Sequence, residues 1–180
     1  MKQLLILAAV IIFSVVKSPL YAQQDPFIQD YLERLENSRI YLIQVAETMP
    51  EDKYDFKATP EEMSFAENLL HIGFAMNWHG QSLIGGQETP DWKTDTAYKT
   101  AQRTKAEMIE IIEETFDKTI RTIEEFDPLK LDDSLEYFGL TRTKRQILLM
   151  LTDHITHHRG QMLVYMRLNG LVPPRYVLFQ

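Results

Sequence analysis

The chain has 180 residues, with 19 Lys and Arg, 26 Asp and Glu, and no cysteine. This length predicts one compact domain, and the lack of cysteine excludes disulfide scaffolds, thiolate zinc sites, iron–sulfur clusters and a cysteine nucleophile. The formal net charge of −7 argues against nucleic acid as a partner, because phosphate binding needs clustered basic side chains. Any chemistry must therefore use histidines, carboxylates or hydroxyls.

The beginning of the chain differs in composition from the rest. Lys2 precedes an apolar run of about a dozen residues, and the small residue Ala22 follows a few positions later. We expect residues 1–22 to be a signal peptide and residues 23–180 to be the mature domain. The apolar run is shorter than the roughly 20 residues that span a bilayer. The sequence therefore predicts an exported protein, periplasmic or secreted, with no stable membrane span after cleavage.

Apolar residues recur at helical spacing in the first half of the mature chain. One helix is predicted from Asp25 to Pro50, because its apolar positions are spaced alternately four and three residues apart. A second helix is predicted to begin at Thr59-Pro60, which offers an N-cap and a first-turn proline. It is predicted to end at Gly85-Gly86.

The second half repeats this pattern. A third helix is predicted from residue 96 or 100 to residue 126, where Asp127-Pro128 breaks it. Residues 129–142 predict a connector with a little strand, and a fourth helix is predicted over residues 143–169. The sequence thus predicts an all-α fold, an up-down four-helix bundle with long connections and room for one short extra helix.

All five histidines fall on the second and fourth predicted helices. His154 and His158 lie on the inward stripe that runs along the fourth helix to Leu168, and their spacing puts both imidazoles on one face. Two imidazoles in this arrangement can bind one divalent metal. His157 points about 60° to the other side of His154, by the 100° step of an α-helix, and is a weaker candidate. The alternative is that these histidines are core side chains hydrogen-bonded to carbonyls or water.

A third ligand would come from the second helix, where periodicity leaves two candidates. The strict apolar stripe of that helix includes His79 and therefore favours it. His71 instead shares a mixed stripe with Asn68 and Trp78, which suits either a cavity wall or a solvated flank.

Two carboxylates lie near these histidines along the chain. Glu67 precedes His71 by one turn, and Asp153 adjoins His154. Both are candidates for an outer hydrogen-bond acceptor or a general base, although acidic residues on a helix are more often solvated.

Four further side chains are candidate site residues, each with a structural alternative. Gln161 follows the inward stripe and is a candidate to orient a ligand or water. Arg159 is a candidate to bind an anionic substrate, with a structural ion pair as the alternative. Trp78 and Tyr165 are candidate pocket walls, with core packing as the alternative.

Several stretches of the chain match the pattern of a known family. They are MSFAENLLHI at residues 63–72, Asn77-Trp78, DHITHHRGQ at residues 153–161, and the loop at residues 49–56. In these residues the chain resembles the DinB/YfiT-like family of small four-helix-bundle proteins with a three-histidine metal site. The resemblance extends over essentially the whole mature chain.

The resemblance implies that the metal ligands are His71, His154 and His158, with His79 and His157 as alternatives. Three protein ligands leave an open position, which is typical of a catalytic metal, and zinc or nickel is expected. We expect a hydrolase-type enzyme that acts on a small molecule. The alternatives are a thiol-dependent S-transferase or isomerase and a non-catalytic metal-binding or interaction module. Export disfavours a cytosolic thiol cofactor, and the resemblance leaves a homodimer open.

Overall fold

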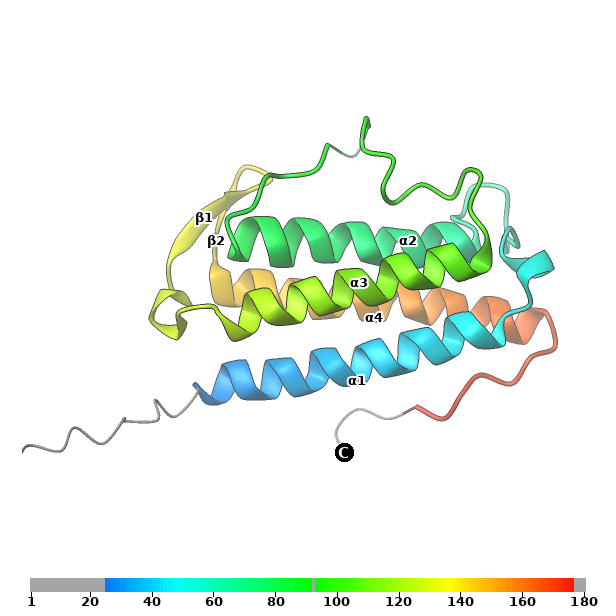
Figure 1. Ribbon diagram of the computed structural model, residues 1–180, viewed down its shortest axis with the longest axis horizontal. Helices are drawn as coiled ribbons and strands as arrows, with labels where there is room; N and C mark the ends of the chain where they lie inside the picture. Colours follow the sequence, from blue (N-terminus) through cyan, green and yellow to red (C-terminus); the bar gives the residue numbers. More distant parts are fainter. Residues whose placement is uncertain (1–24, 92, 177–180) are drawn as a thin grey trace, which may run out of the picture.

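A computed structural model describes residues 25–91 and 93–176, so the predicted signal peptide lies outside the described residues. The described part folds into a bundle of four helices (Figure 1). They are α1 (Pro26–Thr48), α2 (Phe65–Met76), α3 (Lys105–Glu124) and α4 (Lys144–Leu168). The π-helical segment η2 (Asn77–Ile84) continues α2 directly. The predicted all-α four-helix bundle is confirmed.

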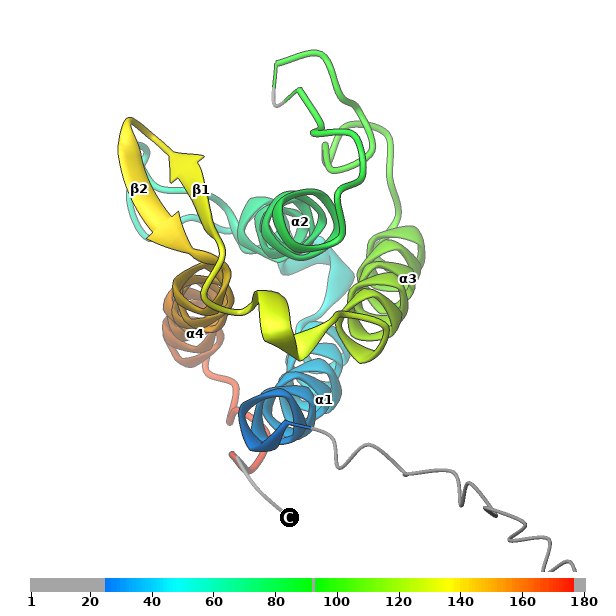
Figure 2. The same cartoon turned by 90° about the vertical axis from the view of Figure 1, so that its left-hand side faces the viewer.

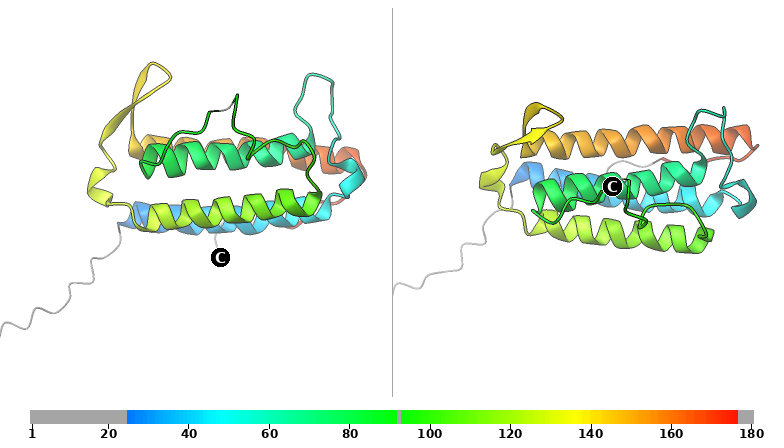
Figure 3. Two further views of the ribbon diagram at one scale, coloured as in Figure 1. Left: turned by 45° about the horizontal axis from the view of Figure 1, so that its top comes forward. Right: turned by 90° about the horizontal axis from the view of Figure 1, so that it is seen from above.

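The four helices lie at the corners of the bundle when it is seen end-on (Figure 2). α2 packs against α3 and α4, and α1 packs against the same two helices. α1 and α4 run in one direction and α2 and α3 in the other, so the order is up, down, down, up (Figure 1). The four-helix bundle is as predicted, but its helices do not alternate in direction as the predicted up-down order implies. Because α2 and α3 are parallel, the connection between them must return along the whole bundle. Figure 3 shows one layer formed by α2 and α4 and a second formed by α1 and α3.

Side-chain caps explain where α1 and α4 begin. The carboxylate of Asp25 accepts hydrogen bonds from the backbone N–H groups of Phe27 and Ile28. Thr143 and Gln146 form a capping box at α4, in which each side chain bonds the other residue's backbone N–H. The starts predicted for these two helices are confirmed.

The starts predicted for the other two helices are wrong. Ser64 and Glu67 form the capping box of α2, while Thr59-Pro60 lies in a turn before the helix. Thr104 caps α3 in the same way with Glu107, eight and four residues after the two predicted starts. A capping box satisfies two backbone donors reciprocally, and the predicted starts formed no such pair.

A β-hairpin joins α3 to α4 and confirms the predicted strand in this connector. Its strands β1 (Ser134–Tyr137) and β2 (Leu140–Thr143) are antiparallel, with Tyr137 paired with Leu140 beside the turn. The hairpin rises beside α2 and α4 at one end of the bundle (Figure 2). In place of the short extra helix, the connections contain the 3₁₀ turns η1 (Glu51–Lys53) and η3 (Pro128–Lys130).

The inward apolar stripes of the four helices meet in one core. Its fully buried side chains include Leu35 on α1, Leu69 on α2, Phe116 on α3 and Leu151 on α4. Leu168 is 60% exposed, contrary to the predicted stripe, because α4 ends at this residue.

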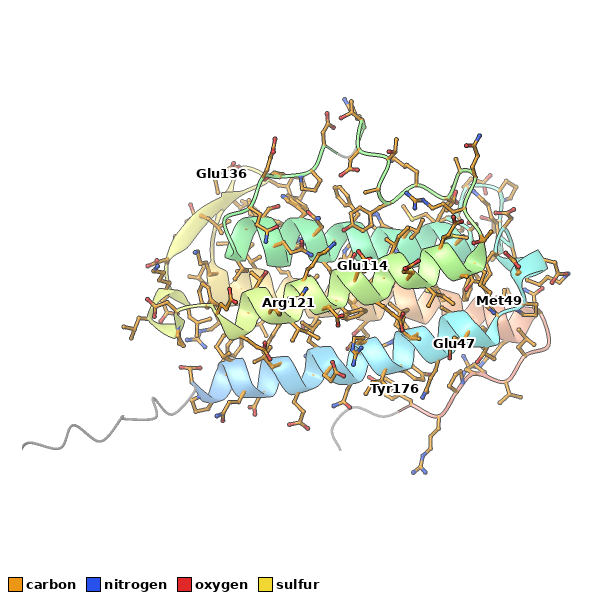
Figure 4. All side chains as sticks on the ribbon, viewed as in Figure 1. Glu47, Met49, Glu114, Arg121, Glu136 and Tyr176 are labelled. Atoms are coloured by element: carbon orange, nitrogen blue, oxygen red, sulfur yellow. The ribbon has the colours of Figure 1, made fainter. Side chains whose placement is uncertain are left out.

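Charged side chains are prominent on the outside of the bundle. Glu47 on α1 and Glu114 and Arg121 on α3 are exposed there (Figure 4). Within the described ranges, none of the helices combines the length and the apolar composition needed to cross a membrane.

Candidate metal centre and its cavity

Three histidines from α2 and α4 meet between these two antiparallel helices. His71, His154 and His158 each offer a ring nitrogen, and the three atoms lie within 4.8 Å of one another. The ring centroids are separated by 4.5 to 5.0 Å. The mixed stripe of α2 that carries His71 is therefore turned toward α4 rather than solvated.

Asn68 fixes the tautomer of His158. The amide nitrogen of Asn68 donates to the carbonyl oxygens of Met63 and Ser64, at 3.1 and 2.9 Å. Its amide oxygen therefore faces His158 Nδ1, which lies 2.8 Å away. Because an amide oxygen only accepts, His158 Nδ1 must donate, and Nε2 keeps its lone pair. Metal-binding histidines are oriented in this way by an outer hydrogen bond, and this role of Asn68 was not predicted from the sequence.

The imidazoles of this group are neutral at pH 7. Burial, reinforced by the neighbouring imidazoles, lowers the pKa of His154 to about 3 and that of His158 to about 4. Burial likewise lowers the pKa of His71. His154 Nε2 is buried and accepts no hydrogen bond from the described part of the chain. Converging neutral imidazoles with available lone pairs match the donor set of a divalent metal, so this group could hold a metal ion.

The other two histidines lie outside this group. His79 Nδ1 donates to the carbonyl of Ala75 at 2.8 Å, so Nε2 accepts from the Tyr137 hydroxyl at 2.9 Å. Both of its nitrogens are thus engaged, and its ring centroid lies 6.1 Å from that of His154. His157 is exposed, and its Nε2 lies 2.9 Å from the amide nitrogen of Gln161.

A cavity of about 670 Å³ opens beside the three-histidine group, with His71 and His154 in its wall. Four aromatic side chains make up much of the rest. They are Phe74, Trp78, Tyr137 and Phe138. Ala75, His79, Thr89 and Pro90 complete the lining. The structure thus places Trp78 in the wall of this cavity. The hairpin residues Tyr137 and Phe138 were missed because sequence periodicity says nothing about where a connector folds back.

The π-helical segment places Trp78 and His79 together at this cavity. Its hydrogen bonds reach five residues back, as in the 3.1 Å bond from Gly85 N–H to the Gly80 carbonyl. A π-helix has more residues per turn than an α-helix, so neighbouring side chains diverge less. The Trp78 and His79 rings accordingly lie with centroids 4.7 Å apart. The predicted α-helical spacing contained no signal for this change.

The carboxylates singled out in the sequence lie away from the three-histidine group. Glu67 accepts a 2.6 Å hydrogen bond from the backbone N–H of Ser64 and pairs with Lys57 at 2.9 Å. Burial tends to raise the pKa of Glu67, but the Ser64 hydrogen bond and the Lys57 charge outweigh it and lower the pKa. Glu67 therefore completes the helix cap, and Asp153 is exposed on α4.

Arg159 and Tyr165 pack elsewhere in the bundle. The buried Arg159 guanidinium lies beside the rings of Tyr41 and Tyr176, 5.1 and 5.4 Å from their centroids. The buried position agrees with a structural role for Arg159. Its partners, however, are aromatic rings and not the carboxylate that the predicted ion pair requires. Tyr165 is buried in the core, and its hydroxyl donates to the Met63 carbonyl at 2.9 Å. It does not line the cavity.

The chain is similar to known proteins over most of its length. The curated protein YjoA of Bacillus subtilis, described as uncharacterized, is 24% identical over 131 residues, which cover 71% of this chain and 80% of YjoA. The crystal structure of that DinB-like protein matches with a TM-score of 0.63 at 23% identity, covering 84% of this chain and 97% of YjoA.

Two further crystal structures share the fold. A DinB-like protein from Bacillus cereus matches with a TM-score of 0.65 at 21% identity, over 84% of this chain and 95% of that one. A conserved protein from Enterococcus faecalis matches with a TM-score of 0.63 at 15% identity, over 78% and 95%. The sequence model of the DinB superfamily matches residues 34–162, which include α2, most of α4 and the three histidines between them. The chain belongs to the DinB superfamily.

Proposed function

We propose that this protein is an exported metal-dependent enzyme, with a hydrolase-type activity on a small molecule. In this proposal His71, His154 and His158 bind one divalent ion, zinc or nickel, since imidazole suits both metals. The observation that carries the proposal is the convergence of three ring nitrogens within 4.8 Å at the edge of a cavity. Three protein ligands leave a coordination position for water or substrate, as is typical of catalytic sites.

The chain's own residues prepare this site in three ways. Burial keeps the imidazoles neutral, so no proton has to leave before a metal binds. Asn68 holds the Nδ1 proton of His158 and so directs Nε2 toward the other two rings. The cavity gives a small molecule access to His71 and His154. A bound divalent ion would supply Lewis acidity and would lower the pKa of a bound water toward about 7.

Export is part of the proposal and rests on the sequence. The apolar segment before Ala22 and the absence of cysteine are both compatible with an exported protein. Cell fractionation and N-terminal sequencing of the recovered protein test it. We expect a periplasmic or secreted protein that begins near residue 23, and an unprocessed cytosolic protein would contradict export.

Metal analysis with matched variants tests the site. His158→Gln should lose the metal, because it removes one of three ligands. His157→Gln is the control, since His157 is the adjacent residue on α4 but is exposed. The wild type and His157→Gln should each bind about one equivalent of zinc or nickel. Equal metal content in all three proteins would contradict the ligand assignment.

Turnover of a panel of small esters and amides tests the catalytic part. The fully metal-loaded protein should hydrolyse at least one class, and both EDTA and His158→Gln should abolish the activity. A metal-loaded protein that hydrolyses nothing in the panel would overturn the proposed hydrolase and favour a non-catalytic metal-binding module.

A further inference from the structure

We infer that the cavity beside the three histidines selects an uncharged, planar, apolar ligand. If the proposed function holds, its substrate carries an aromatic or similarly flat apolar group next to the reacting bond. That the ligand is a substrate depends on the proposed function, whereas the binding preference depends only on the cavity.

The side chains that line the cavity are uncharged and largely aromatic. Four of its side chains are aromatic, and no described residue that lines it is Asp, Glu, Lys or Arg. A charged ligand would lose its hydration here without gaining a charged partner from the wall. Lys99 acts electrostatically on His71, but its side chain is not part of the lining. The wall therefore favours a neutral ligand that aromatic rings can contact.

The aromatic wall is also held in a fixed arrangement. The Trp78 and Tyr137 rings are stacked, with centroids 5.4 Å apart and planes inclined by 19°. The Tyr137 hydroxyl donates to His79, which in turn donates to the Ala75 carbonyl. This chain of hydrogen bonds ties the hairpin to the helix that carries Trp78. A ring surface fixed before binding loses less entropy when a flat ligand stacks on it.

The conformation of the hairpin turn independently supports a role for Phe138 at the cavity. Phe138 and Gly139 have φ angles of 50° and 75°, as in a type I′ turn, where Asn-Gly is preferred. A bulky aromatic residue rarely adopts a positive φ. Phe138 is nevertheless 74% exposed, and its ring meets Trp78 edge-on with a centroid distance of 5.1 Å. Phenylalanine is therefore unfavourable at position 138, both because of the positive φ and because the ring is exposed. Its presence is explained if the ring forms part of the rim of the cavity.

The size of the cavity sets the scale of the ligand. Its volume of about 670 Å³ falls in the range of small-molecule sites, roughly 300–1,000 Å³. A ligand with up to three aromatic rings would fit between the aromatic wall and the imidazoles of His71 and His154.

A matched pair of fluorescent probes tests the preference. N-phenyl-1-naphthylamine is neutral, and 8-anilino-1-naphthalenesulfonate has the same ring framework with a sulfonate added. Both are titrated into the full protein in EDTA. We expect the neutral probe to bind with a stoichiometry of one and at least tenfold more tightly than the sulfonate. Equal or tighter binding of the sulfonate would overturn the inference.

Three variants locate the binding. Trp78→Ala should weaken binding of the neutral probe at least tenfold, while Phe126→Ala, which alters a half-buried aromatic residue outside the lining, should leave it unchanged. Phe138→Asn suits the turn better, so the protein should stay at least as stable while the probe binds several-fold more weakly. Undiminished binding to a folded Phe138→Asn or Trp78→Ala protein would contradict the cavity as the binding site.

The probe experiment is independent of the metal proposal. A protein that binds the neutral probe in EDTA but takes up no zinc or nickel would contradict the proposed function and support the ligand preference. A protein that binds metal but prefers the sulfonate probe in EDTA would support the proposed metal site and contradict the ligand preference.

Discussion

The two layers of the bundle use the same helical periodicity for different purposes. In the layer of α1 and α3, the inward stripes bury apolar side chains such as Leu35, Leu42, Ile112 and Phe116. In the layer of α2 and α4, the helices and the continuation η2 also carry all five histidines of the chain, of which His157 is exposed. The layer of α1 and α3 therefore serves mainly to stabilise the fold. In the layer of α2 and α4, imidazoles that need hydrogen-bond or metal partners occupy positions that apolar side chains could otherwise fill. Breaking each layer separately should have separable effects.

The largest expected effect comes from the apolar layer. Phe116 on α3 is completely buried, so Phe116→Ala removes its contacts and leaves a cavity. We expect the free energy of unfolding to fall by about 3–5 kcal/mol. Chemical denaturation measures this loss, and metal titration below the unfolding transition should still give one equivalent. A loss of metal binding by the folded variant would contradict the separation of the layers.

The next largest effect should come from Asn68. Asn68→Ala frees the Nδ1 side of His158, and the affinity for zinc or nickel should fall about 10- to 100-fold. Asn68→Asp keeps an acceptor for the Nδ1 proton and should bind metal more tightly than Asn68→Ala.

Asn77→Ala serves as the control for Asn68, because Asn77 adjoins α2 but bonds the Tyr98 hydroxyl instead of a site histidine. Competition titration with a chelator measures all of these proteins. Equal affinity in wild type and Asn68→Ala would show that this hydrogen bond does not orient the ligand.

The metal-free protein should lose stability on acidification. The pKa values of His154 and His158, about 4 or lower in the folded state, lie below the ordinary value of 6.5. Below pH 6.5 the unfolded chain therefore takes up protons that the folded chain does not. Each of these imidazoles lowers the free energy of unfolding by at most about 1.4 kcal/mol per pH unit. The loss should continue until the pH falls below the folded pKa values.

Denaturation in EDTA between pH 6.5 and 5 measures this dependence, since most carboxylates stay ionised there. The neighbouring imidazoles of His71, His79 and His157 also act on these groups. The double variant His154→Gln/His158→Gln should have a flatter profile than the wild type. Identical profiles would mean that these two imidazoles are not neutral in the folded protein.

The smallest effects should come from the helix caps. Ser64→Ala at α2 and Thr104→Ala at α3 each remove a capping hydrogen bond and should cost about 1 kcal/mol of stability. Only Ser64→Ala should also weaken metal binding, because α2 carries Asn68 and His71. Thermal denaturation and metal titration compare the two variants. A similar loss of metal affinity in Thr104→Ala would contradict the local character of the effect.

The bundle itself could be predicted because its apolar stripes follow one helical period over four long segments. Asp25 and Thr143 carry strong local capping signals, and the helices begin there. Thr59-Pro60 carries a similar signal, but the helix begins after Ser64, where Glu67 completes a reciprocal pair. When two local capping signals are equally strong, the helix begins at the one whose hydrogen bonds form in the folded chain.

The surroundings of the three histidines were less accessible from the sequence. Periodicity favoured His79, but the antiparallel packing of α2 against α4 brings His71 into the group. The π-helical segment departs from the period on which the prediction was based. Tyr137 and Phe138 reach the cavity only because the hairpin folds back onto α2. These features depend on contacts between distant segments, and no local pattern encodes them.

An anomalous difference map from a zinc-soaked crystal of the protein tests the central claim most directly. The account predicts one strong peak between α2 and α4, roughly 2.0–2.1 Å from one ring nitrogen of each of His71, His154 and His158. A principal peak bound by His79 or His157, or no peak between these helices, would contradict it.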